Sequence, residues 1–169
     1  MTLGPVIRRL CIPLVALFLV LAPLFAAVHA AEQHRRVAVV SFGLFGPQGV
    51  FRREATAAAD IVASRFGAHP VVVRFNTKTG GDATVQTLAA TLQAEATKMN
   101  GGNDVLFLIL TSHGSPDGLA INAGRVIETL QPSNLAQMLE RTGVRHKVVV
   151  ISAAIPESSF LGLLMPIHS

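Results

Sequence analysis

Apolar residues along the chain fall into two alternating patterns. Short continuous apolar runs, each ending at glycine, proline or polar residues, are typical of strands buried on both faces. Between the runs, apolar residues recur every three or four positions, which is the spacing of one face of a helix. We therefore expect strands over residues 37–42, 70–75, 105–110 and 147–152, and helices over residues 52–66, 83–99 and from 131–134 onward.

The alternation of strands and helices predicts an α/β fold with a parallel sheet and helices on both of its faces. Right-handed crossovers between the strands follow from the general handedness rule. Gly67 and Gly143 stand where the first and last helices end, and Asp82 and Ser133 are the expected N-caps of the second and third helices. Residues 119–121 are expected to form a small hairpin or a strand extension.

Residues 1–30 have the pattern of a secretory signal. Two arginines precede an apolar core over residues 10–25, and small residues precede the expected cleavage site before Ala31. We expect the protein to be exported, to the periplasm or outside the cell. The alternative is an uncleaved segment, residues 10–28, that anchors the protein in the inner membrane.

Composition excludes several classes of function. Half of the residues are apolar and 14% are charged, so the chain can bury a core, and the net charge of +4 is mild. Basic residues are scattered and there is no Trp or Tyr, so we expect no nucleic-acid partner. Cys11, inside the apolar leader, is the only cysteine, so the rest of the chain offers no thiol nucleophile and no disulfide. No spacing of His, Asp and Glu suggests a metal site, and we expect no cofactor.

The candidate functional residues directly follow the strand over residues 105–110. It runs into a polar segment that contains His113, and the carboxyl ends of strands in α/β sheets commonly carry functional residues. The last apolar run ends at Ala154, 41 residues after His113, and parallel neighbours would bring both ends together. Ser112 is not expected to form a dyad with His113, because adjacent side chains on an extended chain point to opposite faces.

The glycine-rich loop over residues 43–49 fits neither a Walker loop nor a dinucleotide fingerprint.

Several segments carry a resemblance to a known family; they cover residues 51–66, 74–77, 104–114, 118–120, 132–135 and 142–153. Through them, residues 36–153 resemble the bacterial branch of the legumain-like cysteine peptidases. The resemblance implies a caspase-like, Rossmann-like three-layer fold and a peptide or protein substrate. It also implies that His113 is the catalytic base, that the Gly114 amide helps to bind the oxyanion, and that the nucleophile is a cysteine directly after Ala153.

The chain departs from the family at this decisive position, which Ala154 occupies. We tested whether one deleted nucleotide accounts for the departure. A gene segment encoding Ala-Cys-Tyr-Ser-Gly-Val-Phe-Ile-Pro-Gly-Leu-Ala-Asp-Ala-His-Ser-Leu, once it loses the first base of the Cys codon, can encode the sequence observed from Ala153 to Ser169. We therefore hypothesise a partial peptidase domain over residues 31–153 and a frameshifted, aberrant tail over residues 154–169, and we expect marginal stability.

Three interpretations remain open at this point. The first is a legumain-like peptidase by descent that is inactive as written. The second is a pseudoenzyme that binds peptides or a partner beside His113, and the third is an unrelated exported α/β binding domain. Legumain-like enzymes typically cleave after Asn and carry an acidic residue two positions before the nucleophile. Ser152 stands at that position, so an asparagine preference is not expected.

Overall fold

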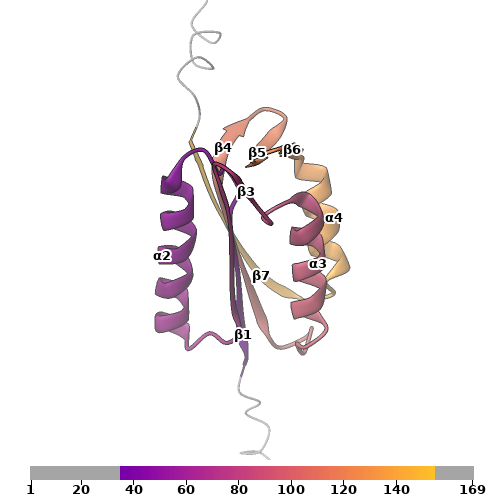
Figure 1. Ribbon diagram of the computed structural model, residues 1–169. Helices are drawn as coiled ribbons and strands as arrows, with labels where there is room; N and C mark the ends of the chain where they lie inside the picture. Colours follow the sequence, from indigo (N-terminus) through magenta and orange to yellow (C-terminus); the bar gives the residue numbers. More distant parts are fainter. Residues whose placement is uncertain (1–34, 155–169) are drawn as a thin grey trace, which may run out of the picture. The chain divides into compact units, whose positions relative to one another are not determined.

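The computed structural model describes residues 35–154, and the fold below is that of this part of the chain. The predicted signal or anchor, residues 1–30, and the tail beyond Ala154 lie outside the described residues. In chain order the elements are β1 (Val37–Gly43), α2 (Gly49–Phe66), β2 (Val71–Thr77), β3 (Gly80–Gly81), α3 (Val85–Ala96), β4 (Val105–Ser115), β5 (Gly118–Ala123), β6 (Val126–Leu130), α4 (Pro132–Arg141) and β7 (His146–Ala154) (Figure 1).

The sheet is mixed and strongly curled, so the predicted parallel, Rossmann-like three-layer sheet of the caspase or legumain type is wrong. Six strands follow one another in the order β3-β2-β1-β4-β5-β6, and β7 lies beside β4 off this path. Along this path in the described part, three of the five pairings are antiparallel, namely β2–β3, β4–β5 and β5–β6. The parallel pairings are β1–β2, β1–β4 and β4–β7.

The prediction failed because the sheet continues where the sequence suggested turns. β4 does not end near Leu110 but runs to Ser115, and a short turn then reverses the chain into β5. Residues 119–121, expected to be a minor hairpin or extension, belong to the full β5–β6 hairpin. This hairpin adds the antiparallel half of the sheet.

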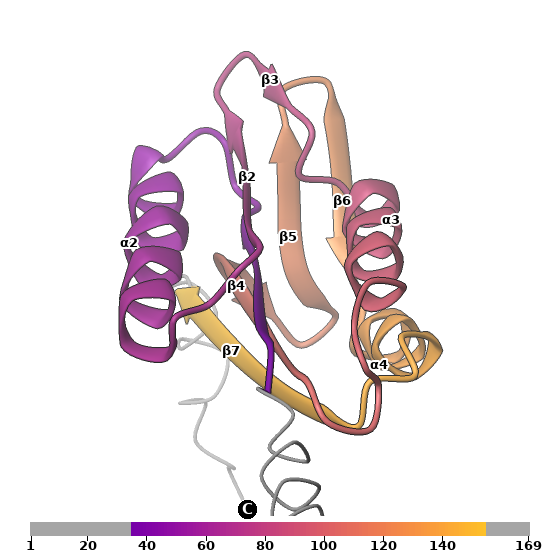
Figure 2. The same ribbon diagram turned by 90° about the horizontal axis from the view of Figure 1, so that it is seen from below.

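The segment that follows β1 forms backbone hydrogen bonds with β4 and β5, and these bonds hold the sheet in its curled form. The Leu44 amide donates to the Thr111 carbonyl over 3.0 Å, and the amide of Asn122 in β5 donates to the Leu44 carbonyl over 3.0 Å. The Gly46 amide then donates to the Asn122 carbonyl over 2.9 Å. A β-carbon at Gly46 would come within 2.2 Å of the Thr77 carbonyl oxygen, so only glycine fits there. The hairpin therefore bends over one face of the sheet (Figure 2).

Helices cover the two faces of the sheet unequally. α2 lies on one face, and α3 and α4 lie on the other (Figure 1). Alternate residues of β1 divide between these faces: Val39 joins the smaller core with Ala59 of α2, whereas Phe42 joins the larger core with Leu88 of α3. Both faces are apolar because both are covered, which explains the continuous apolar runs in the sequence.

β7 is less covered than the other long strands. Among the described residues it pairs only with β4, and four consecutive side chains, Val148 to Ile151, are 38–50% exposed. An edge strand with exposed apolar residues favours association with other chains. The expectation of marginal stability or aggregation stays a prediction.

Helix ends differ in part from the prediction. Thr84, not Asp82, caps α3, because its side chain accepts a hydrogen bond from the Thr87 amide and Thr87 completes a capping box. α4 begins after Gln131 without a side-chain cap, so the predicted role of Ser133 is also wrong. Gly67 ends α2 in the left-handed conformation, as predicted.

The buried side chain of Asn76 in β2 joins the loop after β1 to the segment before α3. Its side chain is 3% exposed, and its Nδ2 donates to the carbonyls of Leu44 (2.8 Å) and Ala83 (2.9 Å) while its Oδ1 accepts from the Ala83 amide (2.9 Å). We expect Asn76→Ala to lower the free energy of unfolding by about 2–4 kcal/mol in urea denaturation, because buried backbone groups lose their partners. The control Asn134→Ala, at an exposed position of α4, should change it by less than about 0.5 kcal/mol. Equal losses in the two variants would contradict this role.

Candidate functional site

His113 and Ala154 lie directly beside one another. β4 and β7 are parallel neighbours, and their register pairs His113 with Ala154. The Nδ1 atom of His113 lies 3.4 Å from the Ala154 carbonyl oxygen. The structure therefore brings together the two positions that the sequence singled out.

The imidazole of His113 is partly buried between two phenylalanine rings. The Phe45 ring centroid lies 4.7 Å from it at an interplanar angle of 84°, and the Phe51 centroid lies 5.0 Å from it at 76°. Such edge-to-face contacts are favourable between aromatic rings. Phe45 comes from the loop after β1 and Phe51 from the first turn of α2, so three separate segments fix the ring.

α2 is seated closely against the carboxyl ends of β1 and β4. The Thr111 hydroxyl of β4 donates to the Phe51 carbonyl over 2.8 Å, and the Ser41 hydroxyl of β1 donates to the Ala55 carbonyl over 2.7 Å. A β-carbon at Gly43 would lie 2.9 Å from the Phe51 carbonyl oxygen, so glycine permits this approach. The seating of α2 places Phe51 against His113.

Ser112 faces the opposite side of β4 from His113. Its side chain is buried and its hydroxyl donates to the Ala120 carbonyl in β5. Ser112 and His113 therefore form no dyad, as the alternation of side chains along a strand predicts.

Gly114 lies within β4, opposite Leu119 of β5. A β-carbon at Gly114 would come 3.0 Å from the Ala153 Cβ, so a larger residue here would crowd the end of β7. Glycine thus lets β4 and β7 lie close together beside the His113–Ala154 pair. The role of the Gly114 amide in binding an oxyanion stays a prediction.

A carboxylate lies near the same pair, and sequence reasoning missed it. The Ser152 hydroxyl in β7 donates to Oε2 of Glu54 in α2 over 3.4 Å, although the two residues are 98 positions apart in the chain. Ser152 and Ala154 are on the same face of β7 because side chains alternate along a strand. Glu54 is half-buried. The position two residues before Ala154 is therefore next to an acidic group, which a different element supplies.

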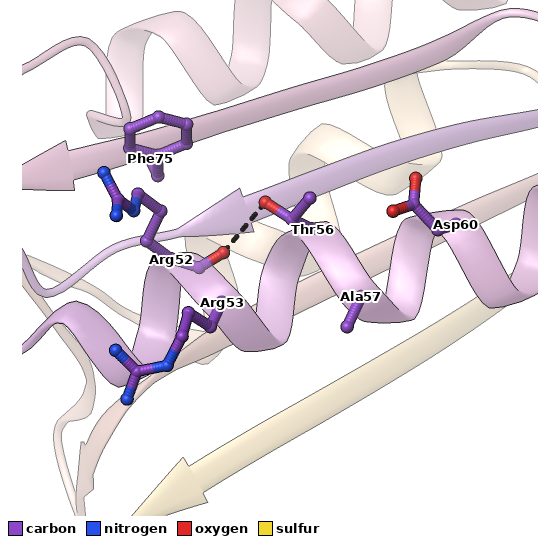
Figure 3. A pocket seen from close by; sticks show the side chains of 6 residues that line it. All are labelled: Arg52, Arg53, Thr56, Ala57, Asp60 and Phe75. Atoms are coloured by element: carbon purple, nitrogen blue, oxygen red, sulfur yellow. Dashed lines mark hydrogen bonds between the residues drawn. The ribbon is translucent and has the colours of Figure 1, made fainter.

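A separate hollow lies over α2 and the end of β2 (Figure 3). It has a volume of about 390 Å³ and is lined by Arg52, Arg53, Thr56, Ala57, Asp60 and Phe75. The guanidinium carbon of Arg52 lies 5.4 Å from the centroid of the Phe75 ring, and the Arg53 side chain points another way (Figure 3). Neither His113 nor Ala154 lines this hollow, so it is distinct from the candidate site.

Within residues 35–154, no group of three or more His, Cys, Asp or Glu side chains could hold a metal ion. None of the helices described there is both long enough and apolar enough to cross a membrane.

No known family model matches the chain, and no curated protein has a matching sequence.

Proposed function

We propose that this chain descends from a legumain-like cysteine peptidase, and that Ala154 occupies the position of the nucleophile. The observation that supports the proposal is the register of β4 and β7, which sets His113 beside Ala154. The proposal rests on this pair and on the sequence resemblance around it. It does not rest on the sheet, whose mixed and curled form differs from the one expected.

The chemistry requires a thiol and an imidazole on the same face of neighbouring strands. Neighbouring strands are about 4.8 Å apart, so a cysteine side chain in place of Ala154 would be within reach of the His113 ring. There the imidazole would accept the thiol proton and the thiolate would attack the carbonyl carbon of a peptide bond. The rings of Phe45 and Phe51 would hold His113 in position for this proton transfer.

As written, the protein lacks this nucleophile, because residues 35–154 contain no cysteine and Cys11 belongs to the N-terminal segment. We therefore expect it to bind peptides without cleaving them. A frameshift at the codon for Ala154 accounts for the loss.

The proposal is tested by placing a thiol at position 154. The full chain carrying Cys11→Ser and Ala154→Cys should react with iodoacetamide at pH 6 about 10–100 times faster than the same chain with His113→Ala. The reason is that a neighbouring histidine lowers the pKa of a cysteine thiol. Alkylation rates followed by mass spectrometry give this ratio.

Val148→Cys in the Cys11→Ser chain is the matched control, because Val148 is an exposed residue of the same strand. Its alkylation rate should not depend on His113. If His113→Ala leaves the rate at position 154 unchanged, the proposed site does not exist. Ala154→Cys alone should not restore peptidase activity, because the sequence after it remains out of frame.

A further inference from the structure

Glu54 is an acidic group without a basic partner. The two ion pairs found within residues 35–154 are Arg74–Asp82 and Lys98–Glu95, and neither includes Glu54. Within residues 35–154, its side chain accepts one hydrogen bond, from the Ser152 hydroxyl over 3.4 Å. A half-buried carboxylate with one hydroxyl donor retains the capacity to accept further hydrogen bonds.

The basic residues nearest to Glu54 in the chain do not neutralise it. The guanidinium of Arg52 lies over the Phe75 ring, on the side of α2 that faces the separate hollow (Figure 3). Nη1 of Arg53 lies 3.5 Å from the point where a β-carbon at Gly49 would stand, so this side chain folds back toward the start of α2. The negative charge of Glu54 is therefore open to a cation from outside the chain.

Glu54 also lies at a suitable distance from the reacting position. Ser152 and Ala154 are two residues apart on one face of β7, which corresponds to about 6.6 Å along a strand. An extended lysine or arginine side chain can span such a distance. A residue of a bound peptide whose carbonyl group lies beside position 154 can therefore place a cationic group against Glu54 and the Ser152 hydroxyl.

We propose that Glu54 makes this site select a basic residue, Arg or Lys, at the reacting position of the bound peptide. The inference rests on the proposed function, since it assumes that a peptide lies between His113 and position 154. The proposed site would therefore prefer Arg or Lys at the reacting position, and not the Asn that legumain-like enzymes typically prefer. A charge-assisted hydrogen bond to the Glu54 carboxylate supplies the selectivity.

The experiment uses affinity labels that react with a thiol at position 154. The full chain with Cys11→Ser and Ala154→Cys is treated with acetyl-Ala-Ala-Xaa chloromethyl ketones, in which Xaa is Arg, its neutral analogue citrulline, or Asn. The thiolate sulfur attacks the methylene carbon, a carbon–sulfur bond forms and chloride leaves. Second-order rate constants are measured by mass spectrometry.

We expect the Arg label to react about 10–100 times faster than the citrulline label. In Glu54→Gln this ratio should fall to about one, because the charge is removed while the side-chain shape is kept. Glu140→Gln, which removes a charge at an exposed position of α4, should leave the ratio unchanged. Thermal melting of each variant checks that it is folded.

The outcomes separate the two proposals. If iodoacetamide reacts in a His113-dependent way but the Arg and citrulline labels react equally, the selection by Glu54 is wrong and the proposed function stands. A ratio that persists in Glu54→Gln likewise overturns the role of Glu54. If the iodoacetamide rate does not depend on His113, the proposed function fails, whatever the labels show.

Discussion

A chain with one base restored at the codon for Ala154 is expected to hydrolyse peptide bonds, and its His113→Ala variant to lose most of that activity. Under the frameshift hypothesis, the restored base returns the reading frame that encodes Ala-Cys-Tyr-Ser-Gly. Removing a positioned general base typically lowers a rate by 10²–10⁴, so we expect a decrease in kcat/KM of about 10²–10⁴-fold. A panel of fluorogenic peptides with Arg, Lys or Asn before the scissile bond measures it.

Two controls make this prediction specific. His146→Ala, at the opposite end of β7, should leave kcat/KM within about twofold of the restored chain, because His146 pairs with Val105 and not with the site. The chain as written should show no activity. If the restored chain cleaves nothing, or if His146→Ala reduces the rate as much as His113→Ala, the peptidase proposal is wrong. Genomic sequence across the codons for residues 150–158 tests the frameshift independently.

Phe42→Ala is expected to be the most destabilising of the single substitutions considered. Phe42 is fully buried at the end of β1, in the larger core beneath α3 and α4. Truncating a buried phenylalanine costs about 3–5 kcal/mol, through lost burial and the cavity that remains. That is a large part of the 5–15 kcal/mol that stabilises a typical domain. Urea denaturation of the full chain, followed by circular dichroism, should show the loss as a lower midpoint.

The matched control for this substitution is Phe66→Ala at the end of α2. Phe66 is 58% exposed, and its ring lies 5.2 Å from that of Phe107. We expect a loss below about 1.5 kcal/mol, from this one aromatic contact. Comparable losses in the two variants would mean that the core does not lie where the structure places it.

The helices and the four long parallel strands could be predicted from the sequence, but the antiparallel strands and the assembly of the sheet could not. Apolar runs identified β1, β2, β4 and β7, and in β1 and β4 these runs reflect burial on both faces of the sheet. The extension of β4 escaped notice because Thr111 and Ser112 suggest a turn. Both are buried and bonded to carbonyls, of Phe51 and Ala120 respectively, and such long-range partners are invisible in a linear pattern.

Only part of the candidate site, His113 and Ala154, could be predicted from the sequence. The ends of two apolar strands pointed to His113 and Ala154, and the register of β4 and β7 places them side by side. Phe51 and Glu54 reach the site because α2 packs against the strand ends, and Phe45 reaches it from the loop after β1. That seating depends on the close approach at Gly43, which no spacing of residues along the chain reveals.

The two halves of the site are built by different parts of the fold. β4, the loop after β1 and the first turn of α2 fix the His113 ring, and β7 takes no part in those ring contacts. β7 contributes Ser152 and position 154, and it pairs with β4 alone among the described residues. If the chain descends from a peptidase as proposed, a change confined to the side chain at position 154 removes the nucleophile and leaves these aromatic contacts in place.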